Sequence, residues 1–386
     1  MPWMERRVRM LREEFIALIE KEDRNISALC REFGISRKTG YKWIKRYQES
    51  GSLEDQNRKP KTSRSKTDEK IERLIFELRQ ERPGWGARKI QAFLSHKGYE
   101  MPCVRTVNNI LKRNGFISLE ASLARRPFKR FEREQNNELW QADFKGDILM
   151  LDGDRCYPLT ILDDHSRYAL LIEPRHDQKD VLRSFIPVFQ HYGLPEAILT
   201  DNGANFAGFK NGYTQFERAL MDQDILPIHG RVYHPQTQGK IERFHRSMES
   251  EVLRLHRPIN FADATEVLDQ WKSVYNFERP HEALGDRCPA QVYTPSQRSY
   301  LEKVQPYEYG SQYHLIKINN WGYLRFADYQ IYISETFRDT RVQLIPSEGD
   351  DSVLVCYRNF IIAKIDVTNG ELLRRKAYRL RSLYNQ

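Results

Sequence analysis

Long apolar runs and paired cysteines are both missing from this chain of 386 residues. No stretch approaches the roughly 18 consecutive apolar residues of a membrane-spanning helix, so we expect no membrane partner. The five cysteines stand singly, at positions 30, 103, 156, 288 and 356. That spacing disfavours a zinc knuckle and predicts a reducing compartment. The first fifteen residues carry charges where a signal peptide needs an apolar stretch, so we expect a soluble cytoplasmic protein.

Basic charge is abundant, and it is concentrated in the first third of the chain. Overall, 62 Lys and Arg against 53 Asp and Glu give a net charge of +9. Residues 1–130 alone carry 31 basic and 17 acidic side chains, a net +14, whereas residues 131–386 carry a net −5. This asymmetry favours a polyanionic partner for the front of the chain, and a well-solvated helical surface is the alternative.

The pattern of residues 1–52 predicts three helices. Apolar residues recur at three- and four-residue spacing from Met4 to Glu20, and two shorter helices follow at 27–33 and 37–48. Gly34 separates the shorter pair, which is typical of a helix-turn-helix whose second helix enters the major groove of DNA. An ordinary three-helix bundle is the alternative. The residues expected to contact DNA from the second helix are Arg37, Lys38, Lys42, Lys45 and Arg46.

A second helix-turn-helix-like domain is predicted at residues 68–118, with helices at 68–80, 86–97 and 104–114. Its expected DNA contacts are Arg88, Lys89 and Arg105. A basic linker, 53–67, precedes it and a basic connector, 119–135, follows it; such segments can track a phosphate backbone. Two tandem DNA-reading units fit an enzyme acting on an extended site, but a repressor would carry them as well.

From about residue 136 the pattern changes to strands alternating with helices. Three strands, the second of them at 155–164, are followed by a helix, a strand, a helix, a strand and a long helix from Gly239. This order predicts a mixed sheet with helices packed against it, within a domain spanning 136–300. A trailing helix is expected at 259–278. Short β-branched and aromatic runs then predict a small antiparallel β-barrel at 308–372. The basic tail, 373–386, is expected to be flexible or to touch DNA.

Three acidic residues lie where ligands of such sheets gather, at strand ends and helix starts. Asp143 lies in the first strand, Asp201 ends the fourth, and Glu242 lies in the first turn of the long helix. Carboxylates suit Mg²⁺, and two such ions about 4 Å apart can promote an in-line phosphoryl displacement. We expect Gly203 to turn the chain off its strand with a positive φ. Taken singly, the acids also suit a strand edge, a turn and a helix-dipole partner.

The ordered motifs DF, TDNG, HPQTQGKIERFHR and YNFERPHEALG resemble the integrase core of DDE transposases. The similarity is closest to bacterial insertion-sequence transposases, which share this core with retroviral integrases, and it extends over essentially the whole chain. It implies an RNase H-like fold and a site for two Mg²⁺ ions, with Mn²⁺ as a substitute. Matched motif by motif, it implies that Asp143, Asp201 and Glu242 are the catalytic and metal-binding carboxylates. The His/Cys zinc module of retroviral integrases is absent from the sequence.

Neighbouring polar residues receive supporting roles on the same resemblance. Lys240 and Arg246 are expected to touch DNA, although Arg246 pairing with Glu242 or Glu249 is the alternative. Helical spacing places Glu242, His245 and Arg246 near one face of their helix. Asp163 and Asp164 form the most conspicuous acidic pair, for which a structural role is expected. The residues expected to support the carboxylates from behind are Asn202, His234 and His245.

The resemblance implies a transposase that binds the terminal inverted repeats of an insertion sequence. It would expose 3′-OH groups by metal-dependent hydrolysis and transfer them into target DNA, working on double-stranded DNA as a homodimer or larger assembly, associated with the bacterial nucleoid. A DNA-binding regulator with an inactive integrase fold is one alternative, which the intact carboxylate set disfavours. A site-specific nuclease without strand transfer is the other, and the sequence leaves it open.

Overall fold

The computed structural model describes residues 2–21, 25–55, 67–117, 133–208, 212–230, 239–310, 314–347 and 350–380. The chain divides into two compact units, Met1–Lys66 and Thr67–Gln386. Most of the predicted linker (53–67) and connector (119–135), together with His234 and the last six residues of the tail, lies outside the described residues. None of the helices in the described ranges has the length and apolar character needed to cross a bilayer.

The first unit is the predicted set of three helices: α1 (Pro2–Lys21), α2 (Ile26–Glu32) and α3 (Arg37–Ser50). Ser36 starts α3 because its hydroxyl accepts a hydrogen bond from the backbone N–H of Thr39 at 3.1 Å. A Cβ at Gly40 would overlap Sγ of Cys30, so this glycine lets α2 and α3 pack closely. Trp43 is buried in the core of the unit, with the Arg12 guanidinium 3.7 Å from its ring centre.

The three helices predicted for residues 68–118 are also present, as α4 (Glu69–Glu81), α5 (Ala87–His96) and α6 (Val104–Arg113). Asp68 caps α4 by accepting a hydrogen bond from the N–H of Lys70. Ile75, Ile90 and Ile110 come one from each helix and are fully buried together, which closes the small core.

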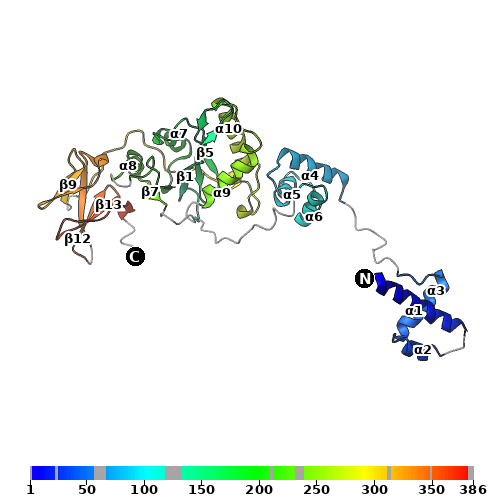
Figure 1. Cartoon of the computed structure of the whole chain (residues 1–386). Helices are drawn as coiled ribbons and strands as arrows, with labels where there is room; N and C mark the ends of the chain where they lie inside the picture. Colours follow the sequence, from blue (N-terminus) through cyan, green and yellow to red (C-terminus); the bar gives the residue numbers. More distant parts are fainter. Residues whose placement is uncertain are drawn as a thin grey trace. The chain divides into compact units, whose positions relative to one another are not determined.

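A mixed five-stranded sheet forms the centre of the second unit (Figure 1), in the order β5-β4-β1-β6-β7. Strands β5, β4 and β1 are antiparallel, whereas β1, β6 and β7 are parallel. The five strands are β1 (Trp140–Phe144), β4 (Leu159–Asp163), β5 (Ala169–Glu173), β6 (Ala197–Thr200) and β7 (Leu226–His229).

The single strand predicted at 155–164 is in fact two. Strand β3 (Arg155–Cys156) pairs with β2 (Ile148–Leu149) in a separate hairpin, and β4 starts only at Leu159. Pro158 lies between β3 and β4 and has no N–H to donate to a strand ladder, which is consistent with the break.

Four helices pack on the two faces of the sheet. Helices α7 (Leu182–Tyr192) and α8 (Gln215–Asp222) pack with Ile161 and its neighbours, whereas α9 (Gly239–Met248) and α10 (Phe261–Phe277) pack with Leu162. Successive residues of a strand face opposite sides, so these are opposite faces. The long helix expected from Gly239 continues as one π-helical turn, η3 (Glu249–Leu253). The 3₁₀ turns η4 (Glu282–Leu284) and η5 (Pro289–Gln291) follow α10.

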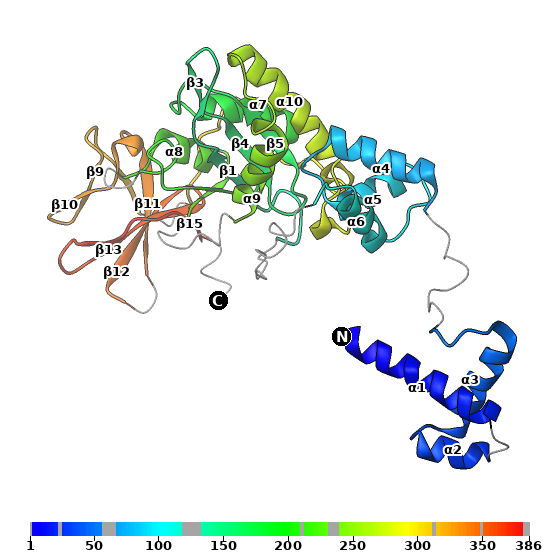
Figure 2. The ribbon, with the colours of Figure 1, turned by 45° about the vertical axis from the view of Figure 1, so that its right-hand side comes forward.

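The C-terminal part is an antiparallel sheet in the order β14-β13-β12-β11-β8, with β15 also pairing with β13 (Figure 2). A separate hairpin, β9–β10, and the 3₁₀ turn η6 (Glu335–Phe337) accompany it. The predicted β-rich domain is present, and its closure into a barrel stays a prediction. The strands are β8 (His314–Lys317), β9 (Tyr323–Phe326), β10 (Tyr329–Tyr332), β11 (Arg341–Pro346), β12 (Ser352–Tyr357), β13 (Phe360–Asp366), β14 (Leu372–Arg374) and β15 (Tyr378–Arg379).

The prediction of a flexible tail from residue 373 is wrong as far as residue 380. Strands β14 and β15 both pair with β13, and Arg379 forms ion pairs with Asp224 and Glu196 of the central domain. These partners lie more than 150 residues earlier in the chain, which is why the local basic composition did not reveal them.

Candidate active site

Asp143 lies near the end of β1, and its side chain is only 20% exposed. Burial, followed by the negative charges of Asp201 and Glu242, raises the pKa of this carboxyl group to about 7. The three predicted carboxylates therefore lie close enough to interact electrostatically, and the charges of Asp201 and Glu242 disfavour ionisation of Asp143.

Asp201 directly follows β6, and its carboxylate closes the turn after the strand. Its Oδ1 accepts a hydrogen bond from the N–H of Gly203 at 3.0 Å. The prediction of a positive φ at Gly203 is wrong. The glycine matters for proximity instead, because a Cβ there would lie 3.0 Å from Oδ1 of Asp201. Asn202, predicted to support the carboxylates, fixes the turn by donating from Nδ2 to the carbonyl of Gly230 at 2.8 Å.

Glu242 is exposed in the first turn of α9, whose start is fixed by buried polar contacts. The amide of Gln141 donates to Asp164 at 2.7 Å and accepts from the N–H of Ile241 at 3.3 Å. Lys240 forms an ion pair with the same Asp164. Lys240, predicted to contact DNA, thus anchors the helix that carries Glu242 to the sheet.

His245 lies behind Asp143 and belongs to the buried side of α9. Its Nε2 pairs with the Thr160 hydroxyl at 2.7 Å, and that hydroxyl donates to the backbone carbonyl of Asp143 at 2.9 Å. Burial, with a contribution from Lys145, lowers the pKa of His245 to about 3, so its ring is neutral near pH 7. Arg246, the next residue of α9, is exposed, whereas His245 is only 8% exposed.

Carboxylate oxygens of this charge are the donor set that a hard divalent cation prefers. Within the described residues, however, no group of three or more His, Cys, Asp or Glu side chains is close enough to share an ion. The chemistry of the three acids thus fits Mg²⁺, and holding it requires their side chains to come closer together.

The Asp163–Asp164 pair has the structural role expected for it. Asp163 is fully buried and accepts hydrogen bonds from the N–H of Asn137 and from the N–H and hydroxyl of Ser166. His281 is likewise a packing residue, because it accepts a hydrogen bond from Arg279 at 3.2 Å and lies against the ring of Tyr275.

The predicted DNA contacts divide by their surroundings. Arg37, Lys38, Lys42, Lys45 and Arg105 are exposed on α3 and α6, and Arg46 lies over the Trp43 ring. Arg88 pairs with Asp286 at 2.9 Å and with Glu282 at 3.1 Å. Lys89 pairs with Glu251 at 3.1 Å. Arg88 and Lys89 therefore join α5 to the segment that follows the central sheet.

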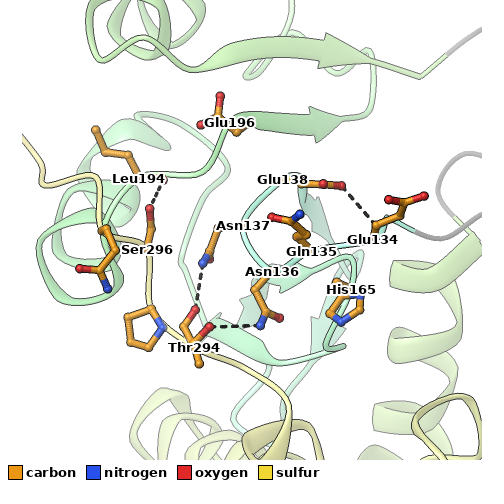
Figure 3. A pocket seen from close by; sticks show the side chains of 12 residues that line it. Glu134, Gln135, Asn136, Asn137, Glu138, His165, Leu194, Glu196, Thr294 and Ser296 are labelled. Carbon is orange, nitrogen blue, oxygen red and sulfur yellow. Dashed lines mark hydrogen bonds between the residues drawn. The ribbon is translucent and has the colours of Figure 1, made fainter.

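A cavity of about 510 Å³ lies at the opposite end of the strands of the central sheet from Asp143 and Asp201 (Figure 3). Asn137 precedes β1 and Glu196 precedes β6, whereas Asp143 and Asp201 lie at the far ends of these parallel strands. The cavity is therefore separate from the candidate site. Its lining residues are Glu134, Gln135, Asn136, Asn137, Glu138, His165, Leu194, Glu196, Thr294, Pro295, Ser296 and Gln297.

Sequence reasoning missed the residues that hold the carboxylates from behind. Thr160 and Gln141 carry no motif of their own, because their partners lie 85 and 100 residues away. Glu217 is 4% exposed, lies near Asp201 in the fold, and did leave a local signal. Thr214 and Glu217 have the spacing of a helix capping box, and the structure forms that box.

Protein-family models match both the N-terminal part and the central part of the chain. Two integrase core domain models match residues 133–235 and 223–289, a helix-turn-helix domain model matches residues 11–61, and a homeodomain-like domain model matches residues 39–111. A solved structure, the HTLV-2 integrase catalytic core domain in complex with magnesium, is 15% identical with a TM-score of 0.32, covering 41% of this chain and 97% of that one.

Two curated relatives come from bacteria. The insertion element IS407 uncharacterized 31.7 kDa protein of Burkholderia multivorans is 30% identical, over 56% of this chain and 78% of that protein. The transposase for transposon Tn552 of Staphylococcus aureus is 25% identical, over 59% of this chain and 53% of that protein. The chain thus spans about half the length of the latter. On these matches, this chain belongs to the integrase-core family of insertion-sequence transposases and retroviral integrases.

Proposed function

We propose that this protein is a DNA transposase that binds the terminal inverted repeats of an insertion sequence, cleaves to expose 3′-OH ends and joins those ends to target DNA. The observation that carries the proposal is the electrostatic coupling of Asp143 to Asp201 and Glu242, whose charges act together with burial, the larger cause, to raise the pKa of Asp143 to about 7. Three mutually repelling acids at the end of a sheet are suited to holding divalent cations beside a polyanionic substrate.

In this proposal Asp143, Asp201 and Glu242 hold two Mg²⁺ ions, which Mn²⁺ can replace. Bound Mg²⁺ supplies activation of the attacking oxygen and stabilisation of the leaving oxygen. The remaining contribution comes from the chain. The Thr160 hydroxyl holds the backbone of Asp143, and Gln141 holds the start of α9, the helix that carries Glu242. Water is the first nucleophile and the 3′-OH of the cleaved end is the second, with no covalent protein intermediate.

DNA recognition is assigned to the two helix-turn-helix domains, through the exposed cations of α3 and α6. The contact from Arg246 belongs to the same proposal, because this exposed side chain lies one turn beyond Glu242 on α9. Since two ends must be joined in one complex, the working form is a dimer or a larger assembly on DNA. In this proposal the central domain has an RNase H-like fold, and the C-terminal sheet closes into a small barrel.

The test incubates the full chain with Mg²⁺, a labelled element end and target DNA. Cleaved and joined products support the proposal. Cleavage without joining would identify a nuclease instead, and binding alone would identify a regulator with an inactive core. Asp201→Asn is expected to abolish both reactions while end binding persists. Asp152→Asn, which alters an exposed acid in the β2–β3 hairpin, serves as the matched control and is expected to remain active.

A further inference from the structure

Behind Asp201 lies a chain of polar side chains, buried at Thr200 and Glu217 and half-buried at His229, that crosses from β6 to β7 and on to α8. The Thr200 hydroxyl donates to the carbonyl of Asp201 at 3.0 Å and pairs with Nδ1 of His229 at 2.9 Å. The Nε2 of His229 pairs with Oε1 of Glu217 at 2.8 Å. Thr200 is 1% exposed and Glu217 is 4% exposed, so these contacts are sheltered from water.

Glu217 also holds the other end of the turn that begins at Asp201. Its second oxygen, Oε2, accepts hydrogen bonds from the N–H of Gly208 at 3.1 Å and from the N–H of Thr214 at 2.7 Å. Between these anchors, the N–H of Gly203 is bonded to the Asp201 carboxylate and its carbonyl accepts from Phe206 and Ala207. The Glu217 carboxylate therefore holds both ends of segment 201–208. It bonds to Gly208 directly and reaches Asp201 through His229 and Thr200.

The start of α8, which carries Glu217, is itself held by the C-terminal sheet domain. The N–H of Tyr213 donates to the Ser334 hydroxyl at 3.0 Å, and the Tyr213 hydroxyl donates to the carbonyl of Ile362 at 2.7 Å. Tyr213 is 6% exposed and packs edge-on against Phe337. The position of Glu217 is thus fixed from two sides, by its capping box and by a neighbouring domain.

We infer that Glu217, His229 and Thr200 are positioning residues that set the geometry of segment 201–208 and hence the direction of the Asp201 carboxylate. This inference rests on the proposed function in so far as Asp201 is a metal ligand. Partners that orient a ligand through hydrogen bonds typically change metal affinity or activity by about 10- to 100-fold when they are removed.

The experiment compares His229→Phe, Thr200→Val and Glu217→Gln in the full chain. Phenylalanine keeps the ring volume and valine keeps the shape of threonine, but both remove the hydrogen bonds. Glutamine keeps an oxygen acceptor for Gly208 and Thr214 and offers an N–H to His229, so it is the conservative variant. Val188→Ala, which shortens a buried side chain of α7, is the control for a general loss of stability.

Hydrogen exchange of segment 197–208 in metal-free protein and Mn²⁺ affinity by electron paramagnetic resonance are the two readouts. We expect His229→Phe and Thr200→Val to accelerate exchange of this segment and to weaken Mn²⁺ binding by about 10-fold or more. Glu217→Gln and Val188→Ala are expected to keep the exchange and affinity of the unmodified protein. If His229→Phe does not fold, Thr200→Val makes the same comparison.

Unchanged exchange in the two disruptive variants would overturn the inference, and so would an equal change in Val188→Ala. Faster exchange without weaker Mn²⁺ binding would also overturn it. Failure of the proposed function has a different signature, because the unmodified protein would then bind no Mn²⁺ while its segment 197–208 still responded to His229→Phe.

Discussion

Asp143 and Glu251 are both largely buried acids of the same domain, and their surroundings have opposite effects. Burial alone would raise the pKa of Glu251, but Arg279 at 2.9 Å and Lys89 at 3.1 Å lower it overall. For Asp143, burial and the two neighbouring acids all raise the pKa, to about 7. A buried acid that joins parts of the fold has cations built around it, whereas Asp143 is surrounded by further negative charge. We therefore propose the surroundings of Asp143, the acidic region, rather than those of Glu251, the paired region, as the ones suited to a cation from solution.

Substitution in the acidic region is expected to have the largest effect. Glu242→Gln keeps the shape of the side chain but removes a negative charge, so we expect joining activity to fall about a thousandfold, the equivalent of several kcal/mol of transition-state stabilisation. Single-turnover joining of a pre-cleaved DNA end measures this. Glu266→Gln, an exposed acid on α10, is the matched control, and equal activity of the two variants would remove Glu242 from the site.

Removing a cation from the paired region, where Glu251 contacts Arg279 and Lys89, is expected to lower the free energy of unfolding. Arg279→Met leaves Glu251 buried without its closest cation, and the loss of one partner from a buried ion pair costs about 3–5 kcal/mol. Urea unfolding measures the change. Lys89→Met is expected to cost less, because its side chain is 26% exposed against 8% for Arg279. An Arg279 variant as stable as the unmodified protein would show that the pair contributes little.

The pH dependence of stability is expected to have opposite sign in the two regions. Between about 3.8 and about 7 the folded state binds a proton at Asp143 that the unfolded state has released, so stability falls as pH rises through this window. In metal-free protein at pH 8, Asp143→Asn should therefore stabilise the fold, by at most roughly 4 kcal/mol for a shift of about three pH units.

For Glu251 the contribution is present above its ordinary pKa and is lost as pH falls through its lowered pKa. Chemical denaturation at a series of pH values separates the two effects. If Asp143→Asn unfolds with the same pH dependence as the unmodified protein, the carboxyl group at 143 is not destabilised by its neighbours.

The smallest effect on stability is expected at the exposed edge of the paired region. Arg88 is 48% exposed in its ion pairs with Glu282 and Asp286, so Arg88→Ala should change the free energy of unfolding by about 1 kcal/mol or less. Its predicted contact with DNA is tested separately. If Arg88 contacts DNA, Arg88→Ala should bind DNA more weakly. The slope of the logarithm of its binding constant against the logarithm of salt concentration should fall by about one. An unchanged salt dependence would limit Arg88 to its role between the domains.

The sequence alone predicted those elements and site residues whose determinants are close together in the chain or follow one another in a recognisable order. The caps Ser36 and Asp68 mark helix starts, and the succession of Asp143, Asp201 and Glu242 follows a motif order that identifies the core. Contacts between distant residues leave no such signal. The partners Arg88 and Asp286 are 198 residues apart, and β15 pairs with β13 through residues that read as a basic tail. The spacing of Thr214 and Glu217 is that of a capping box, but the link from Glu217 to Asp201 depends on how β6, β7 and α8 meet.

Counting bound Mn²⁺ by electron paramagnetic resonance tests the central claim most directly. The unmodified chain is predicted to bind two ions, as is Glu251→Gln, whose acid lies in the paired region. Asp201→Asn and Glu242→Gln are predicted to bind fewer ions or to bind them more weakly. Equal Mn²⁺ binding by Asp201→Asn and the unmodified chain, or loss of binding in folded Glu251→Gln, would contradict the account.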